Sequence, residues 1–140
     1  TGFHILRAIA LGADTCNCAR AMMMALGCIQ APECNKNTCP TGVATQDPVL
    51  VNGLVIDDKK VRVANFHKHT VDSFVELMAA AGLASSDQIN RSHVYRRVFM
   101  NMVKTYEEIY PPVPEGCLLE GGDSPLEFDV YMERASAQQF

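Results

Sequence analysis

Three features are missing from this sequence, and each absence excludes a class of protein. Positive charge is not in excess, because 12 Lys and Arg stand against 16 Asp and Glu, for a net charge of −4; we expect no nucleic-acid partner. No apolar run approaches the roughly 18 residues that a membrane-spanning helix needs, so we expect no membrane partner. The opening TGFHILRAIALG is too polar and too interrupted for a secretory signal, and we expect a cytoplasmic protein.

The sequence also lacks an initiator methionine, since Thr1 and Gly2 lead straight into a helical pattern. We therefore expect a piece of a longer protein. Its 140 residues are enough for one ordinary domain, and a hydrophobic content of 48% supplies the apolar side chains of a core.

Cysteine, by contrast, is abundant, and its distribution is uneven. Five of the six cysteines lie between Cys16 and Cys39, and Cys117 stands apart. Cys28, Cys34 and Cys39 share one polar loop, with a proline directly after the last. In a cytosolic chain such clustering indicates a metal site more often than a set of disulfides.

The residues alone leave three interpretations of these cysteines open. They could be small core residues, although a polar, proline-rich loop offers little core to join. They could bind zinc, which prefers paired ligands two to four residues apart and four ligands in all. They could bind an iron–sulfur cluster, because thiolates suit iron–sulfide cores and a proline after the last cysteine also occurs in ferredoxin sequences. For zinc, the candidates for a fourth ligand are Cys16, Cys18, His67 and His69.

The first half of the chain has clear helix boundaries. Thr1 is a helix-capping residue, and Gly12 and Gly27 are typical of helix ends. The stretch between the two helices fits a short buried parallel strand. We predict, in order, a helix over residues 1–12, a strand over 13–18, a helix over 20–27 and a loop over 28–48.

Three further helices are expected in the second half. Apolar residues recur at spacings of three and four from Asp57 to Gly82, and successive prolines stop a later helix after Tyr110. Ser124 to Glu127 has the pattern of a capping box. The predicted helices cover residues 57–82, about 92–110, and the segment that follows Pro125. The expected inward stripe of the first is Val61, Ala64, His67, Val71, Phe74, Met78 and Ala81.

A longer stretch carries a resemblance to a known family. The segment ALGADTCNCARAMMMALGCIQAPECNKNTCPTGVATQDP resembles the flavin and cluster segment of the glutamate synthase family, in which C-x5-C-x4-C is followed by PxGVATQ. RVANFHKHTVDSFVELMAAAGL and the RASAQQF ending resemble the shorter, stand-alone FMN-binding members of that family. The resemblance covers essentially the whole chain and is strongest from Leu11 to Pro48.

The resemblance implies a fold class and a domain organisation. The family fold is a TIM (β/α)8 barrel, which takes about 250 residues. The chain is expected to be the C-terminal portion of this α/β barrel followed by C-terminal helices, so that the piece itself is mainly α. Residues 1–27 would be the last barrel units with the FMN phosphate site, 28–48 the iron–sulfur loop, and 49–140 a helical region.

The resemblance also implies cofactors and chemistry. The turn at Ala19 and Arg20 would bind the FMN phosphate, and Cys28, Cys34 and Cys39 would hold a [3Fe–4S] cluster. Electrons from ferredoxin or an NADPH-dependent partner subunit would pass through the cluster to FMN, which would reduce the imine of 2-oxoglutarate and ammonia to glutamate. One-electron and two-electron carriers complement each other in this way.

The resemblance also indicates what the piece does not contain. Nothing resembles the amidotransferase domain, and the residues that would bind 2-oxoglutarate belong to earlier barrel strands. We therefore assign no catalytic residue and expect the piece alone to be inactive. Two alternatives remain, because a fold does not fix a substrate: a metal-stabilised, non-catalytic interaction domain, and a related oxidoreductase that acts on another substrate.

Overall fold

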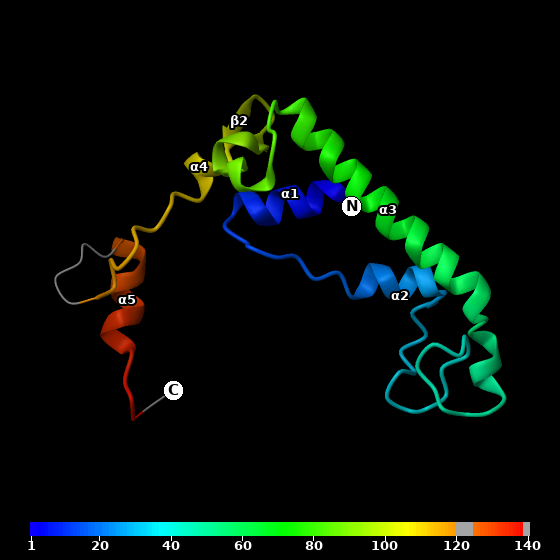
Figure 1. Cartoon of the computed structure of the whole chain (residues 1–140). Helices are drawn as coiled ribbons and strands as arrows, with labels where there is room; N and C mark the ends of the chain where they lie inside the picture. The colour runs from blue at the N-terminus through cyan, green and yellow to red at the C-terminus, as the bar shows by residue number, and fades with distance from the viewer. Residues whose placement is uncertain (120–124, 139–140) are drawn as a thin grey trace. The chain divides into compact units, whose positions relative to one another are not determined.

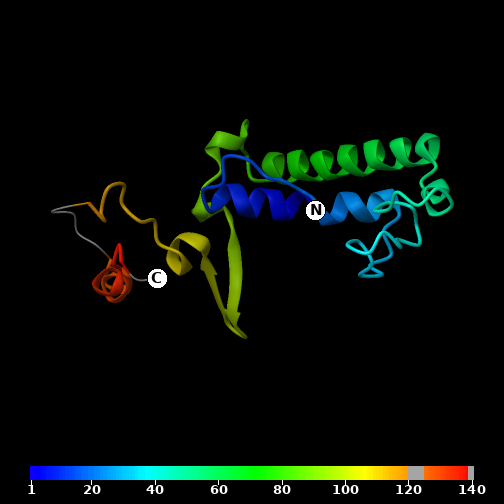
Figure 2. The same ribbon diagram turned by 90° about the horizontal axis from the view of Figure 1, so that it is seen from below.

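The computed structural model describes residues 1–119 and 125–138, and they form helices, loops and one two-stranded sheet (Figure 1 and Figure 2). The chain divides into two compact units, Thr1–Val94 and Tyr95–Phe140. The expectation of a mainly helical piece is confirmed, whereas the described residues contain no parallel sheet of the kind a barrel requires. The functional division into residues 1–27, 28–48 and 49–140 stays a prediction.

In the first unit, helix α1 spans Gly2–Ala10, as predicted. The backbone oxygen of Thr1 accepts a hydrogen bond from the His4 N–H at 3.0 Å, while the Thr1 hydroxyl pairs with the His4 ring at 2.8 Å rather than capping the backbone. Leu6 and Ala10 are buried on one face. Gly12 follows the helix end with a φ of 107°, a backbone conformation that would be strained in a residue with a side chain.

The strand predicted for residues 13–18 is wrong. This segment has no regular structure, and helix α2 follows at Arg20–Leu26 with Gly27 as its left-handed C-cap. A strand is defined by its hydrogen-bonded neighbour, and no described segment pairs with residues 13–18. The predicted second helix and its glycine stop are confirmed.

Helix α3, Ile56–Ala80, is the scaffold of the first unit. Asp57 and Asp58 occupy its first turn, where carboxylates favour the positive end of the helix dipole. Both α1 and α2 pack against α3, and they follow one another along it (Figure 2). A short 3-10 helix, η1 at Leu50–Gly53, precedes α3.

The inward face of α3 is only partly the predicted one. Met78 is buried and Phe74 is half-buried, whereas the other five residues of the predicted stripe are exposed: Val61, Ala64, His67, Val71 and Ala81. Spacings of three and four occur on two neighbouring faces of this helix, and α1 and α2 cover only one of them. The half-buried residues on the covered face include Lys59, Val63, Phe66, Thr70, Ser73, Phe74 and Leu77.

Two further 3-10 turns, η2 at Ser86–Gln88 and η3 at Arg91–His93, complete the first unit. The Asn90 side chain accepts a hydrogen bond from the Ser92 N–H at 3.0 Å and so caps η3. Ile89 and Val94 are buried beside these turns.

The helix predicted for residues 92–110 is wrong, because most of this segment forms a β-hairpin in the second unit. Strands β1, Tyr95–Phe99, and β2, Met102–Thr105, pair antiparallel with a bulge between Arg97 and Phe99, and only a short helix, α4 at Tyr106–Ile109, follows. Five of the nine strand residues are aromatic or β-branched, namely Tyr95, Val98, Phe99, Val103 and Thr105, and these residue types favour a pleated strand over a helix.

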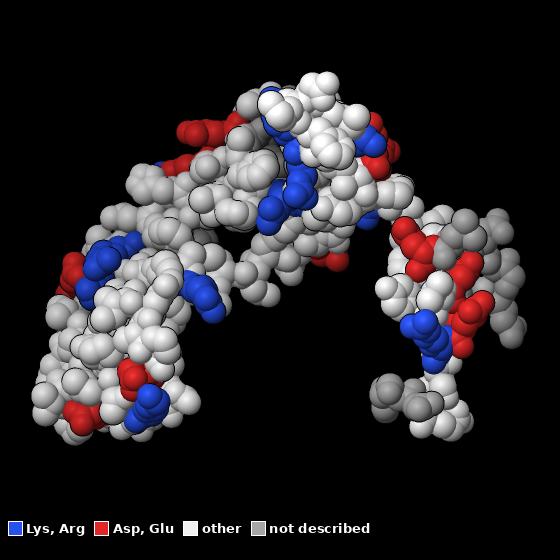
Figure 3. All heavy atoms as spheres, turned by 180° about the vertical axis from the view of Figure 1, so that it is seen from behind, with Lys and Arg blue, Asp and Glu red and all other residues white. Residues whose placement is uncertain are grey.

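The last helix, α5, spans Leu126–Arg134, which confirms a terminal helix after Pro125. The capping box predicted from Ser124 lies outside the described residues. Among the described residues, no helix is both long enough and apolar enough to cross a membrane. Basic and acidic side chains both lie on the face shown in Figure 3, and neither sign forms a continuous surface over the described residues there.

Candidate functional site

The cysteine loop, residues 28–48, begins where Gly27 ends α2 and runs without regular strand or helix to η1, as predicted. It returns along itself through left-handed positions at Gln30, Asn37 and Gly42. Backbone in this rare region is held only where the surrounding contacts fix it. The loop is therefore a shaped element and not a free linker.

Two polar side chains hold this shape. The Asn37 side-chain oxygen accepts hydrogen bonds from the Gln46 N–H at 2.7 Å and from the Thr45 hydroxyl at 3.2 Å. Asp47 accepts from the N–H groups of Val49 and Leu50 at 2.8 and 3.0 Å. The first contact closes the loop across its base, and the second starts η1.

Cys39 lies in the most enclosed part of the loop, with 8% of its surface exposed. The Thr41 hydroxyl lies 3.5 Å from its sulfur. This hydroxyl, together with the backbone N–H groups of Ala44, Thr41 and Val43, lowers the pKa of Cys39 from 9.0 to about 7, against the opposing effect of burial. These donors favour the thiolate, which is the form that binds metals.

Cys28 and Cys34 occupy different settings. Cys28 is half-buried at the end of α2, and its sulfur accepts a hydrogen bond from the Gln30 N–H at 3.4 Å. Cys34 is exposed on a turn that Glu33 braces by accepting hydrogen bonds from Lys36 at 3.1 Å and from the Thr38 hydroxyl at 2.7 Å. All three loop cysteines are free thiols.

The three sulfurs are not gathered around one point. Within residues 1–119 and 125–138, no three His, Cys, Asp or Glu side chains lie close enough to bind one metal ion. This holds equally for the four candidates for a fourth zinc ligand. The donor set nevertheless fits an iron–sulfur centre chemically, because it consists of soft thiols, two of which already accept hydrogen bonds at sulfur. Binding one centre requires the loop to draw its cysteines together.

The predicted flavin residues lie beside two of these cysteines. Ala19 is the N-cap of α2, its carbonyl accepts the Met23 N–H at 3.0 Å, and Arg20 is exposed. A cavity of about 500 Å³ opens between this turn and the cysteine loop. It is lined by Ala19, Arg20, Met23, Met24, Cys28, Gln30, Pro32 and Cys34. The structure thus places both predicted flavin residues and two of the three predicted cluster ligands on one cavity.

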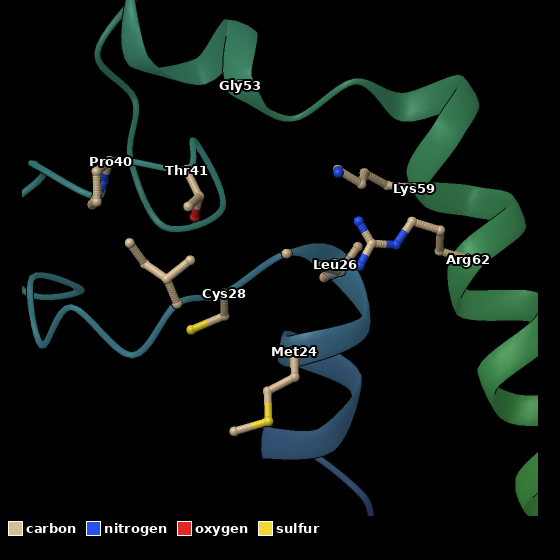
Figure 4. A pocket seen from close by; sticks show the side chains of 10 residues that line it. Met24, Leu26, Cys28, Pro40, Thr41, Gly53, Lys59 and Arg62 are labelled. Atoms are coloured by element: carbon tan, nitrogen blue, oxygen red, sulfur yellow. The ribbon is translucent and has the colours of Figure 1, made fainter.

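A second cavity, next to Cys28, contains two cations that the sequence reasoning missed. Lys59 and Arg62 of α3 line it together with Cys28, Pro40 and Thr41 (Figure 4). The available signal was their spacing of three at the start of α3, which puts both on one helix face. The sequence does not show that this helix face lies beside the cysteine loop, because the two come together only in the folded chain.

The family comparison covers the stretch that contains the cysteine loop and both cavities. Residues 1–84 match the conserved region in glutamate synthase, and the chain therefore belongs to the glutamate synthase family. The resemblance to the glutamate synthase family is confirmed over residues 1–84, whereas its extension to the rest of the chain and to the stand-alone FMN-binding members stays a prediction.

Individual relatives give the extent of the likeness. The chain is 46% identical over 90 residues to the glutamate synthase large subunit-like protein YerD of Bacillus subtilis (strain 168). It is 40% identical over 85 residues to the archaeal glutamate synthase (NADPH) of Methanocaldococcus jannaschii. It is 34% identical over 92 residues to the ferredoxin-dependent glutamate synthase of Antithamnion sp..

These matches cover 64%, 61% and 64% of the chain, but only 17%, 17% and 6% of the three relatives. The chain therefore spans about a sixth of the first two and less of the third. No solved structure matches it.

Proposed function

We propose that this chain is the cofactor-binding C-terminal part of an FMN- and [3Fe–4S]-dependent oxidoreductase of glutamate synthase type. Its parent would form L-glutamate reductively from 2-oxoglutarate and nitrogen supplied as ammonia or by glutamine. The electron donor would be ferredoxin or an NADPH-dependent partner; the names of two relatives mention NADPH and ferredoxin. When bound, the cluster would supply one-electron transfer and the flavin would supply hydride transfer.

One observation carries this proposal: the cavity that joins the Ala19–Arg20 turn to Cys28 and Cys34. The sequence predicts the flavin phosphate site at Ala19 and Arg20 and the cluster site in the cysteine loop. Residues of both stretches line this one cavity. Electron transfer requires two centres that lie close together, and a shared cavity meets this requirement.

The chain's own residues would act mainly by holding and shielding. Cys28, Cys34 and Cys39 would provide one thiolate to each of three irons. The Thr41 hydroxyl and the N–H groups around Cys39 would donate hydrogen bonds to the ligand sulfur, and such bonds adjust a cluster's potential. Arg20, which makes no hydrogen bond or ion pair with another residue that the structure describes, would contact the flavin phosphate bidentately.

The proposal extends to the barrel of the parent protein. There α1 would be the seventh barrel helix and α2 the eighth. Phosphate sites in such barrels are often built after strands 7 and 8 with a helix N-terminus, and Ala19 and Arg20 at the start of α2 would take that place. Substrate binding and proton transfer would fall to residues on other barrel strands, so the chain alone is expected to be inactive.

Reconstitution without oxygen tests the proposal. The purified chain is supplied with iron and sulfide, and bound metal, labile sulfide and the EPR spectrum are measured. We expect about three irons per chain, one for each thiolate. Cys34→Ser should lose the cluster, because a hydroxyl is a hard, weak ligand for iron.

Cys16→Ser is the matched control, since Cys16 is an exposed thiol outside the loop and a candidate for a fourth zinc ligand. This variant should bind as much iron as the unmodified chain. Stoichiometric zinc without iron uptake would overturn the cluster assignment and favour the metal-stabilised interaction domain.

A further inference from the structure

A cavity of about 550 Å³ lies between the C-terminal end of α2, the turn after Cys39 and the first turns of α3 (Figure 4). It differs from the cavity assigned to the flavin, although Cys28 lines both. Pro40 and Thr41 also line it, and the Thr41 hydroxyl lies 3.5 Å from the Cys39 sulfur. The space therefore borders one proposed cluster ligand, Cys28, and a residue, Thr41, that contacts a second, Cys39.

Its opposite wall is cationic. Lys59 and Arg62 extend from α3, and their nitrogens point into the space (Figure 4). The Lys59 side chain is only 18% exposed, and it lies beside Gly27 at the start of the cysteine loop. No Asp or Glu is among the residues that line the cavity.

The two charges are differently compensated. The Lys59 ammonium contacts the carboxylate of its neighbour Asp58 at 3.2 Å. Arg62 makes no hydrogen bond or ion pair with any described residue. Two cations, one of them mostly covered, thus face a space without a carboxylate, and their attraction for an anion there is screened less than it would be in open solvent.

A [3Fe–4S] core with three thiolates is such an anion, and its negative charge grows by one when an electron enters. A nearby cation attracts the reduced form more strongly than the oxidised form. Cations beside a cluster therefore raise its reduction potential, since net charge is one of the properties that set it.

We propose that Lys59 and Arg62 are the charge-compensating residues of the iron–sulfur site, and that they raise the reduction potential of the cluster held by Cys28, Cys34 and Cys39. This inference rests on the proposed function. The step itself is a one-electron reduction: the external donor gives up the electron, and no bond is made or broken. Lys59 and Arg62 are positioning residues that act through the field and do not ligate iron.

A different explanation leads to a different result. Lys59 lies beside Gly27, so the two cations could instead compensate the negative C-terminal end of the α2 dipole. Their loss would then lower the stability of the chain and leave the potential unchanged. Measuring both quantities separates the two explanations.

The experiment is an EPR-monitored redox titration of the anaerobically reconstituted chain. Lys59→Gln and Arg62→Gln should each lower the midpoint potential, and the double variant should lower it further. Lys59→Arg and Arg62→Lys keep the positive charge and should keep the midpoint potential of the unmodified chain. These two variants still test the inference if a variant without the charge fails to fold.

Two lysines on the same helix are matched controls. Lys60 and Lys68 have side chains that are 63% and 70% exposed and that pair with Asp57 and Asp72. Lys60→Gln and Lys68→Gln remove the same charge outside the cavity and should leave the potential unchanged.

The outcomes are distinct. Equal potentials in the parent, Lys59→Gln and Arg62→Gln would overturn the inference while the cluster assignment stands. An equal fall in the control variants would overturn it too, because the effect would then come from overall charge. A parent chain that takes up no iron would instead overturn the proposed function on which the inference rests.

Discussion

Gly2 of α1 lies directly against the backbone of α3 at Phe74. A Cβ on Gly2 would come within 2.3 Å of the Phe74 backbone nitrogen and 2.5 Å of the Ser73 carbonyl carbon. Two backbones can approach this closely only where one residue has no side chain. This contact fixes where α1 crosses α3, and the crossing lets Leu6 and Ala10 become buried.

The first prediction follows from this contact. Gly2→Ala should destabilise the chain by about 1–3 kcal/mol, because a methyl group has to displace helix backbone. The gain of about 0.5–1 kcal/mol that alanine brings to a helix is smaller than this cost. Urea unfolding measures the change, and amide hydrogens of α1 should exchange faster in the variant.

Gly82→Ala is the control, because no atom lies within 4 Å of its Cβ position and only its φ of 73° opposes a side chain. It should leave exchange in α1 unchanged. If Gly2→Ala is as stable as the parent, α1 does not cross α3 at this point.

Elements whose signals are local were predicted well. Gly12, Gly27 and Gly82 mark helix ends through their own backbone preference, which needs no tertiary partner. The segment at residues 92–110 was misjudged because its apolar residues fit a helical period, whereas the β-forming character of Tyr95–Phe99 and Val103 favours a hairpin.

In the candidate site, too, one part could be predicted from local sequence signals and another could not. The cysteine loop could be found from its motif, because its three cysteines lie near one another in sequence. The cavity at Lys59 and Arg62 could not, because it exists only where α3 returns beside the loop. At residues 13–18 the sequence predicted a strand that the structure lacks. Strand formation depends on a pairing partner, which the segment itself does not encode.

The second prediction concerns Gly42, which lets the cysteine loop touch η1. Its φ is 76°, and a Cβ there would lie 2.5 Å from the Leu50 carbonyl oxygen and 2.9 Å from the Leu54 nitrogen. Gly42→Ala should separate the loop from η1, speed hydrogen exchange from residue 39 to residue 54, and reduce iron uptake. Gly116→Ala, with a similar φ of 75° but only the Leu119 side chain nearby, should change neither measurement.

The third prediction concerns the base of the loop. Asn37→Ala removes the oxygen that accepts from Gln46 at 2.7 Å, and it places a less tolerant residue at a φ of 62°. One lost hydrogen bond is worth about 1 kcal/mol, so the Gln46 amide should exchange roughly five- to tenfold faster. Asn37→Asp keeps the accepting oxygen and should stay near the parent rate. Equal rates in the alanine and aspartate variants would show that this bond does not hold the loop.

The last prediction is a pH dependence in the second unit, where Thr105 and Glu108 cap α4. The Glu108 carboxylate accepts from the Thr105 N–H at 2.7 Å and from its hydroxyl at 2.9 Å, and these bonds hold the pKa of Glu108 below its ordinary value of 4.5. Unfolding breaks both bonds and returns the pKa to the ordinary value. The cap therefore stabilises α4 fully above pH 4.5, and this stabilisation is lost as the pH falls through the folded pKa.

Carbon-detected NMR titration of the carboxyl groups and hydrogen exchange of α4 amides, both followed from neutral pH downwards, measure this effect. Glu108→Gln should remove the pH dependence of α4 protection in this range, because an amide cannot titrate. Thr105→Val deletes the hydroxyl donor and should move the pKa of Glu108 back toward 4.5 while the backbone donor keeps part of the shift. Glu107→Gln removes the neighbouring carboxylate, which takes no part in the cap, and should leave the profile unchanged. A Glu108 that titrates at its ordinary pKa in the parent chain would mean that the cap is open in solution, and α4 would then owe its order to the edge-to-face packing of Tyr106 on Tyr110, whose rings lie 5.4 Å apart.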